Sequence, residues 1–385
     1  VIESGYGKYD ENDYNLSDAN LTFVSTPGVG TSNVSSHATV VTALICGKKT
    51  VIENKVYEGA AKGATVYQTA VNYPQDIINA IEMFADMDID VINLSAGLNT
   101  GPGYSSFDKS VDYLVEDNRI LLVKSAGNES SVDSAGFVTS PGKAYNVLTV
   151  GNLETKSNVN EALASPYSLR YTSSTFEYNY LANKPDVVAP GTHVFLPTSD
   201  STVANNGSGT SYAAPIVTAM AAQIMQSDSC AIFNPNAAKN YIICGASNNN
   251  ITGTTVSYGA LMDESGAGLV NAVNTYECSN FGTEYYGVYL ASQVAPTDYR
   301  TVATFDLAKG EHLRIALTFE KEEEIDLSAV YGNNIDIRLV RDNPYSTYCV
   351  ASESTNNNVE LIDTWITTTG EYCLQIRLTD SILES

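Results

Sequence analysis

A serine near residue 210 has the setting that a nucleophile needs. In the segment NGSGTSYAAP, Gly207 and Gly209 precede Thr210-Ser211. The residues that follow are apolar on nearly every side, which predicts a buried helix with Pro215 in its first turn, where a missing N–H costs little. A serine on a tight glycine turn at the start of a buried helix is held rigidly, and the helix dipole favours negative charge beside it. The same pattern also fits a serine that merely caps the helix, so the chemistry depends on its partners.

A serine nucleophile needs a general base, and histidine is the usual one. The chain has three histidines. His312 lies in an alternating stretch near the C-terminus, and His193 follows a Pro-Gly turn without an orienting partner nearby in the sequence. His37 stands in SSHATVVTALICG, where a polar stretch becomes an apolar helix, and it is the best-placed base of the three. A histidine that only marks the start of a helix would fit the same pattern.

Two further side chains could complete a hydrolytic site. Glu3 ends the apolar start of the chain, VIESG, and a buried carboxylate there could fix the tautomer of an imidazole and stabilise the imidazolium. A strand-end carboxylate that faces water is the alternative, and Asp10 and Asp13 in a polar loop are other candidates for the role. Asn128 follows a strand of small residues in SAGNES. Its side-chain amide could donate to an oxyanion, although a turn residue would look the same.

Up to about residue 278, apolar strand-like runs alternate with helical stretches. The strand-like segments are 61–71, 89–97, 119–128 and 145–152, and the helical ones are 76–87 and 110–118. Continuous apolar strands that alternate with helices predict an α/β fold with a mostly parallel sheet and helices on both faces. The ligand site of such a sheet lies at the carboxyl ends of its strands, where Glu3, Asn128 and Ser95-Ala96-Gly97 are expected.

The pattern changes after Cys278 to a period of two. Apolar residues alternate with others in the segments 313–319, 335–339 and 372–378, and polar turns separate them. This predicts antiparallel strands, most simply a β-sandwich of jelly-roll type. We therefore expect two domains that pack against each other, an α/β catalytic domain at residues 1–278 and a β-sandwich accessory domain at residues 279–385.

The composition excludes several classes of protein. With 44 acidic and 20 basic residues the chain carries a formal charge of −24, which repels nucleic acid and anionic membranes. No apolar run reaches the roughly 18 residues of a membrane span. The six cysteines contain no CxxC pair of the zinc or thioredoxin kind. Because the sequence begins inside a strand-like run, we expect that an upstream segment has been removed or left out.

The acidity also favours a particular location of the protein and a particular ligand. It suits a secreted protein that acts outside the cell or at the cell surface, and it offers oxygen ligands to structural calcium. The candidate calcium cluster is Asp10, Glu11, Asn12 and Asp13, although a solvated loop has the same composition.

Several motifs occur in one order along residues 1–278 and together resemble the subtilisin-like serine proteases, the subtilases. They are VIESG, SHATVVTALICG, VINLSAG, SAGNES, KPDVVAPG, GTSYAAP and the closing GAGLVNA. The resemblance implies that Ser211 is the nucleophile, His37 the general base and Glu3 the orienting carboxylate, with no cofactor in the chemistry. It also implies that Asn128 and the backbone N–H of Ser211 hold the oxyanion.

The resemblance further implies where a peptide substrate binds. An extended peptide would pair with the strand formed by Leu94, Ser95, Ala96 and Gly97. The neighbouring segment is made of small residues that leave room for a substrate side chain: Ser125, Ala126 and Gly127.

Three residues depart from the subtilase pattern. Glu3 stands where the family has aspartate, Ala38 follows the histidine in place of glycine, and Tyr212 follows the serine where methionine is frequent. Only Glu3 bears directly on the reacting atoms, and a Ser-His-Glu triad is known on other folds. We expect a serine endopeptidase that works through an acyl-enzyme. The alternative is an attenuated pseudoprotease that binds peptides as a regulator or scaffold.

The C-terminal part resembles, less specifically, the pre-peptidase C-terminal domains of secreted subtilases, and more loosely the kexin-like P-domain. Such a domain could stabilise the catalytic unit, bind substrate or a surface, or act only as a structural lid. A propeptide or an inhibitor is a possible partner besides the substrate. Cys349 and Cys373 could lie on neighbouring strands and pair there.

Overall fold

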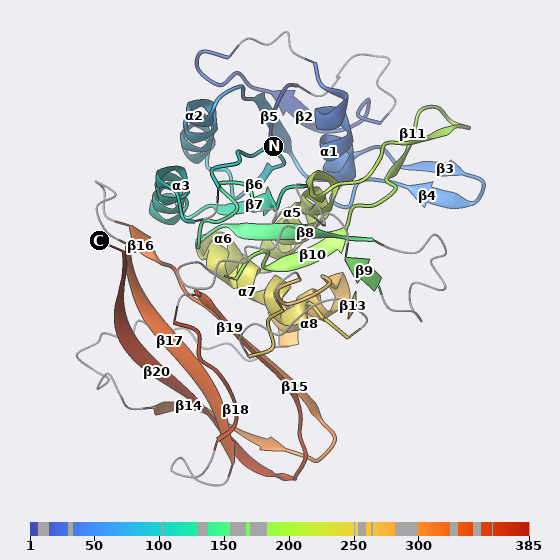
Figure 1. Ribbon diagram of the computed structural model, residues 1–385. Helices are drawn as coiled ribbons and strands as arrows, with labels where there is room; N and C mark the ends of the chain where they lie inside the picture. Colours follow the sequence, from blue (N-terminus) through green and yellow to red (C-terminus); the bar gives the residue numbers. More distant parts are fainter. Residues whose placement is uncertain are drawn as a thin grey trace.

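The computed structural model describes the chain in segments. They are residues 1–6, 15–29, 34–101, 103–128, 138–154, 167–169, 183–249, 251–252, 259–262, 265–281, 299–323, 330–341, 348–355 and 357–384. Within them, an α/β unit surrounds one large sheet, and antiparallel sheets follow near the C-terminus (Figure 1).

Seven parallel strands form the main part of the large sheet, and β1 lies in the middle region. Strand β1 (Ile2–Glu3) pairs with β5 (Val66–Ala70) on one side and with β6 (Val91–Leu94) on the other. The parallel order is β2 (Leu21–Phe23), β5, β1, β6, β7 (Leu121–Ser125), β8 (Leu148–Glu154) and β10 (Val187–Pro190). Two short strands extend the sheet beyond β8: β9 (Tyr167–Leu169), antiparallel to β8, and β13 (Ile251–Thr252), parallel to β9. The predicted mostly parallel sheet is therefore confirmed.

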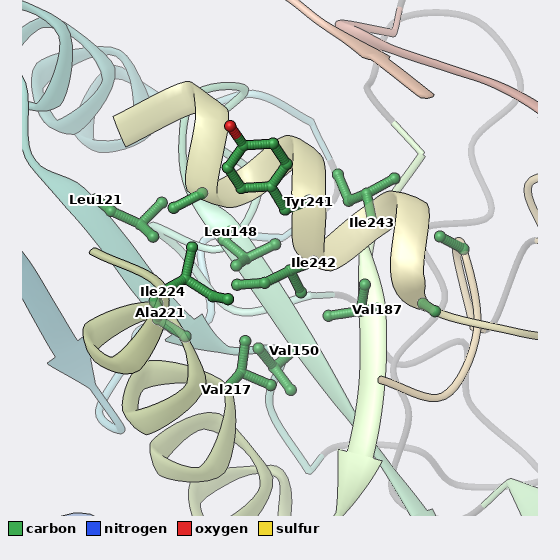
Figure 2. Close-up of a cluster of buried hydrophobic side chains, with 14 of the residues drawn as sticks. Leu121, Leu148, Val150, Val187, Val217, Ala221, Ile224, Tyr241, Ile242 and Ile243 are labelled. Carbon is green, nitrogen blue, oxygen red and sulfur yellow. The ribbon is translucent and has the colours of Figure 1, made fainter. Parts of the chain in front are cut away.

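Helices cover both faces of this sheet because its strands are apolar on both sides. In β7, Leu121 and Val123 point to one face and Leu122 to the other, as the period of two requires. The first face packs on α5 (Thr210–Ser227) and α7 (Pro235–Gly245), and the second on α2 (Pro74–Ala85) and α3 (Ser106–Asp117). Figure 2 shows the first core, where the labelled residues are Leu121, Leu148, Val150, Val187, Val217, Ala221, Ile224, Tyr241, Ile242 and Ile243.

The remaining elements of this unit surround the sheet. Helix α1 (Ser36–Cys46) packs against α5, and α6 (Ser229–Phe233) and α8 (Ala272–Phe281) follow later in the chain. Two hairpins project from the unit: β3 (Thr50–Ile52) with β4 (Lys55–Tyr57), and β11 (Phe195–Pro197) with β12 (Val203–Asn205). In the described part of the chain, no helix combines the length and the apolar character needed to cross a bilayer.

Helices α2 and α3 begin earlier than the predicted residues 76 and 110 because side chains cap them. The Asp76 carboxylate accepts the backbone N–H groups of Asn72 and Tyr73, at 2.9 Å each, and Pro74 occupies the first helical position. In α3, Ser105 Oγ accepts the N–H of Asp108 at 3.3 Å, and the Asp108 carboxylate accepts the N–H of Ser105 at 3.0 Å. Both caps are short-range signals that hydrophobic spacing alone does not carry.

The C-terminal strands are antiparallel, as predicted. One sheet has the order β14 (Arg300–Leu307), β20 (Gly370–Glu384), β17 (Val330–Arg341) and β16 (Glu322–Glu323), and β18 (Tyr348–Ser352) pairs with β17. A second, two-stranded sheet joins β15 (His312–Thr318) to β19 (Val359–Trp365). Apolar side chains from both sheets share one core, which includes Ile337, Leu339, Ile362, Leu374 and Ile376.

The expectation that Cys349 and Cys373 lie on neighbouring strands is wrong. Cys349 belongs to β18 and Cys373 to β20, and β17 lies between these two strands and pairs with both. Strands two places apart are separated by about 10 Å, which exceeds the reach of a disulfide. Both cysteines are free, and so are the four others.

The two parts of the chain pack against each other through polar as well as apolar contacts. Asn146, before β8, exchanges two hydrogen bonds with the backbone of Lys321, at 2.9 and 3.0 Å. From α7, Asn240 donates to the carbonyl of Ala316 in β15 at 3.1 Å. The guanidinium of Arg314 donates back to the carbonyl of Ala267 at 3.0 Å. The predicted packing is confirmed, whereas the boundary at residue 278 stays a prediction.

The core between the sheet and α7 generates a prediction of stability. Ile242 is fully buried there, so Ile242→Ala should lower the free energy of unfolding by about 2–5 kcal/mol through lost contacts and a cavity. Ile232 in α6 is 39% exposed, and Ile232→Ala should change the free energy by about 0.5 kcal/mol or less. Urea unfolding followed by circular dichroism measures both. Similar losses in the two variants would contradict the burial.

Candidate active site

Glu3 and His37 meet at the carboxyl edge of the central sheet. Strand β1 is held on both sides by parallel neighbours, and the Glu3 side chain at its end has no exposed surface. Ser35 caps α1 by accepting the N–H of Ala38 at 3.3 Å, which fixes His37 in the first turn of that helix. His37 Nδ1 then lies 3.0 Å from Glu3 Oε2. The structure thus brings together the predicted base and the predicted carboxylate, although they come from different elements.

The environment of His37 raises its pKa. Burial of the ring lowers the pKa, whereas the hydrogen bond to Glu3 and its negative charge raise it, and the net pKa lies above the ordinary value of 6.5. The other carboxylate oxygen, Glu3 Oε1, is buried and has no hydrogen-bond partner in the described part of the chain. The carboxylate therefore holds the imidazole through one oxygen only.

The ring of His37 packs against Tyr212, the residue after the predicted nucleophile. The two rings have centroids 5.4 Å apart and are tilted by 35°. The Tyr212 hydroxyl donates to the carbonyl of Asn206 at 3.1 Å, which fixes the phenol on the loop before α5. Because Tyr212 follows Ser211 directly, this contact brings α1 and the start of α5 together. The sequence comparison with subtilases singled out Tyr212 only as a departure, and its role as a support of the ring was not foreseen.

Ser211 lies in the first turn of α5, after Gly209 as the N-cap residue. Its hydroxyl donates to the carbonyl of Ser95 at 3.3 Å rather than to His37. Catalytic hydrogen bonds are frequently unformed before substrate binds, and a rotation about the Cα–Cβ bond redirects the hydroxyl. The residue is 9% exposed, so it borders the solvent while its helix stays buried.

Pro215 does not lie in the first turn of α5 as predicted, but inside the helix. A proline in this place leaves the carbonyl four residues earlier, that of Ser211, without its helical N–H donor. The hydroxyl of Ser95 fills the gap by donating to the Ser211 carbonyl at 3.0 Å. Ser95 Oγ in turn accepts the side-chain amide of Asn93 at 3.0 Å, and Asn93 Oδ1 accepts the hydroxyl of Thr218 at 3.0 Å. This buried chain ties the nucleophile's backbone to β6.

Asn128 is oriented by the residue before the nucleophile. Its Oδ1 accepts the backbone N–H of Thr210 at 2.9 Å and the Thr210 hydroxyl at 3.0 Å. The same hydroxyl oxygen accepts the N–H of Gly127 at 3.1 Å. Because these contacts hold the amide oxygen against Thr210, the amide nitrogen Nδ2, which is the donor, points away from Thr210. Asn128 is exposed and lies next to the start of α5, where an oxyanion donor would have to be.

The predicted substrate-binding residues lie at the ends of two adjacent parallel strands, β6 and β7. Their exposure changes along each segment. Leu94, Ser95, Ser125 and Ala126 are buried, Ala96 and Gly127 are half-buried, and Gly97 is exposed. Beyond Gly97, Leu98 pairs with Ser140 through two backbone hydrogen bonds of 3.0 and 2.8 Å. Gly97 and Gly127 therefore lie next to the surface and face the segment that precedes Ser140.

The other candidates of the sequence lie elsewhere. The backbone N–H of His193 donates to Ser208 at 2.9 Å, and His312 stacks on Trp365 in the C-terminal part with centroids 4.7 Å apart. The acidic cluster formed by Asp10, Glu11, Asn12 and Asp13 lies outside the described residues. In the described part of the chain, no group of three or more histidine, cysteine or acidic side chains is arranged to hold a metal ion.

The fold and the edge of the sheet define the class of this chain as subtilisin-like. The chain belongs to the subtilase family, whose sequence profile matches residues 3–268. It is 29% identical to halolysin of Haloferax mediterranei over 212 residues, which are 55% of this chain and 34% of halolysin. It is 31% identical to subtilisin DY of Bacillus licheniformis over 150 residues, 39% of this chain and 47% of that protein. The matched regions thus span only a third to a half of these relatives.

A solved structure supports the fold. The prenylagaramide maturation protease PagA superimposes with a TM-score of 0.54 over 73% of this chain and 94% of that chain. The sequence identity is 22%, so this likeness concerns the fold alone.

The contact between Glu3 and His37 predicts a titration. Glu3→Gln removes the charge but keeps the burial, so the pKa of His37 should fall from above 6.5 to below it. Because the folded-state pKa is the higher one, His37 stabilises the protein fully below about pH 6.5, and this contribution disappears as the pH rises through the folded pKa. The Glu3→Gln variant should lack this contribution.

Proton NMR titration of the histidines, assigned with His37→Gln, measures the pKa of His37. The exposed Glu82→Gln should leave it unchanged, and an unaltered pKa in Glu3→Gln would refute the assignment.

Proposed function

We propose that this protein is a serine endopeptidase that hydrolyses peptide bonds through an acyl-enzyme, with Ser211, His37 and Glu3 as its triad. The observation that carries the proposal is the 3.0 Å contact between Glu3 Oε2 and His37 Nδ1, on a ring that touches the neighbour of Ser211. Membership of the subtilase family supports it. The peptide substrate, and action outside the cell, are part of the proposal.

The chemistry follows from the protonation state that Glu3 imposes. A carboxylate at Nδ1 holds the proton on that nitrogen and leaves Nε2 as the acceptor. Nε2 takes the proton of Ser211 while Oγ forms a bond to the substrate carbonyl carbon. The C–N bond then breaks as His37 returns the proton to the leaving amine. Water, deprotonated by His37, cleaves the acyl ester and restores Ser211.

The oxyanion that forms in both steps needs preorganised donors. Asn128 Nδ2 and the backbone N–H of Ser211 are suited to the task, because the helix dipole of α5 adds positive potential at the same place. Thr210 supports the arrangement by holding the oxygen of the Asn128 amide. A side-chain amide fixed in this way loses no further freedom when the charge develops.

Glutamate can serve in place of aspartate if its longer side chain is held in one position. The Glu3 side chain is fully buried and contacts His37 through Oε2, which supports such an arrangement. In the part of the chain that the structure describes, its other oxygen, Oε1, lacks the second hydrogen bond that would hold the carboxylate more firmly. We therefore expect a working triad whose orienting group is less tightly held.

A fluorophosphonate probe, which forms a covalent bond with activated serines, tests the proposal. The wild-type protein should be labelled and should cut an unstructured protein substrate. Ser211→Ala should lose both, and the matched Ser227→Ala, at the far end of the same helix, should keep both. Folded protein that binds peptides but is neither labelled nor active would point instead to a peptide-binding pseudoprotease.

Two substitutions at Glu3 test the carboxylate. Glu3→Ala should lower kcat about 10³–10⁴-fold because the imidazolium loses its partner. Glu3→Asp should lower kcat less, about 10–100-fold, because the charge remains but stands about one methylene further from the ring. Steady-state kinetics on one peptide substrate measures both. Equal and unimpaired turnover in the two variants would remove Glu3 from the mechanism.

A further inference from the structure

A fully buried lysine lies directly beneath the predicted substrate-binding segments. Lys124 is the fourth residue of β7, where its backbone pairs with Leu94 of β6 and Thr149 of β8. Its side chain has no exposed surface. Lysine is rarely buried without a partner of opposite charge, because the desolvation of an ammonium group is costly.

Within the described residues, the ammonium group of Lys124 has neutral hydrogen-bond partners. Its Nζ donates to the carbonyl and, at 3.3 Å, to the hydroxyl of Ser125, and to the Thr139 hydroxyl at 3.2 Å. In the described part of the chain, no carboxylate lies within ion-pair distance of it. The carboxylate of Asp108 in α3 has the strongest charge effect on Lys124, but it accepts hydrogen bonds from Ser105 and Ser140 and lies 3.8 Å from Lys143 Nζ. The positive charge of Lys124 is thus solvated by the protein but not neutralised.

Two glycines bring this charge close to the surface. A methyl group added to Gly97 would lie 2.7 Å from Thr139 Oγ1 and 2.9 Å from Lys124 Nζ. A methyl group added to Gly127 would lie 2.8 Å from the Thr139 methyl and 3.0 Å from its hydroxyl. Thr139 is half-buried and therefore fills the space between the two glycines, with the Lys124 amine immediately behind it.

We propose that Lys124 determines the specificity of this site by holding an ammonium group beneath Gly97 and Gly127, so that an acidic substrate side chain is preferred above these two glycines. The proposal rests on the proposed peptidase function, because the side chain above the glycines would be that of the residue on the acyl side of the scissile bond. A carboxylate there would be attracted by the Lys124 charge across Thr139, whose hydroxyl accepts from Lys124 Nζ at 3.2 Å and donates to the Ala126 carbonyl at 3.3 Å. Thr139 fills the space below the glycines, which favours aspartate over the longer glutamate.

The charge of Lys124 makes this preference dependent on pH. Burial lowers its pKa to about 7, and the carboxylates of Asp108 and of Glu3 in β1 only partly oppose this. In the described part of the chain, Lys143, which lies against Asp108, and the buried Asp112 of α3 are further charged groups on this side of the sheet. The ammonium form is present below about pH 7 and is lost above it, whereas a substrate carboxylate is charged throughout this range. The preference for an acidic residue should therefore be strong near pH 6 and fade towards pH 9.

Peptides that differ only in one nearly isosteric residue test the proposal. We would compare kcat/KM for fluorogenic peptides with Asp or Asn before the scissile bond, and with Glu or Gln, between pH 5.5 and 9. The wild-type protein should prefer Asp over Asn about 10- to 100-fold near pH 6, and the ratio should fall as the pH rises through 7. Lys124→Met should abolish the ratio at every pH. The matched control is Lys239→Met, since Lys239 is also fully buried but donates to the Tyr145 carbonyl, and it should keep the ratio.

The outcomes separate this inference from the proposed function. Three results would overturn the role of Lys124 while leaving the peptidase function intact. They are cleavage of these peptides without a preference for Asp, an Asp-to-Asn ratio that does not change with pH, and a ratio that persists in Lys124→Met. If Lys124→Met does not fold, the pH dependence of the Asp-to-Asn ratio in the wild-type protein decides whether the proposal holds. If the protein cuts nothing, binding of the Asp and Asn peptides to Ser211→Ala is measured by fluorescence anisotropy. Tighter binding of the Asp peptide near pH 6 supports the role of Lys124, and equal or absent binding refutes it.

Discussion

The site depends on one buried interaction, the hydrogen bond between the carboxylate of Glu3 and the ring of His37. A carboxylate without exposed surface is costly unless a donor meets it, and His37 is its hydrogen-bonding side chain in the described part of the chain. The contact can form only if the end of β1 and the start of α1 are both fixed. The parallel neighbours β5 and β6 fix the first, and the Ser35 cap fixes the second. The sheet topology is therefore a condition for the chemistry rather than a neutral scaffold.

A second constraint joins the nucleophile to the sheet through a missing hydrogen bond. Pro215 deprives the Ser211 carbonyl of its helical donor, and the hydroxyl of Ser95 replaces it. The Ser95 carbonyl also accepts the Ser211 hydroxyl, so the two serines bind each other through side chain and backbone. A proline that would weaken an ordinary helix here makes the start of α5 dependent on β6. The predicted substrate-binding strand and the proposed nucleophile are thus positioned together.

The sequence predicts those features that short-range patterns control. Continuous apolar strands indicated the parallel sheet, and strand ends placed Glu3 and Asn128 at its carboxyl edge. It did not reveal that Thr210 holds the Asn128 amide or that Tyr212 supports the ring of His37, because such contacts join residues brought together only by the fold. The suggestion that Cys349 and Cys373 could lie on neighbouring strands is wrong for the same reason. Strand order decides which cysteines are neighbours, and alternation along one strand says nothing of that order.

Buried lysines show how the acidity of the chain and its interior are connected. Lys124, Lys143, Lys184, Lys239 and Lys321 are all nearly inaccessible. Each cation is compensated differently: Lys184 pairs with Asp186 at 2.8 Å, whereas Lys321 lies over the rings of Phe319 and Tyr145. A formal charge of −24 creates a negative potential that lowers the cost of retaining a cation inside. That background helps to explain how Lys124 can be charged below about pH 7 although its hydrogen-bond partners among the described residues are neutral oxygens. The charge then lies behind Thr139, between Gly97 and Gly127 at the edge of the sheet.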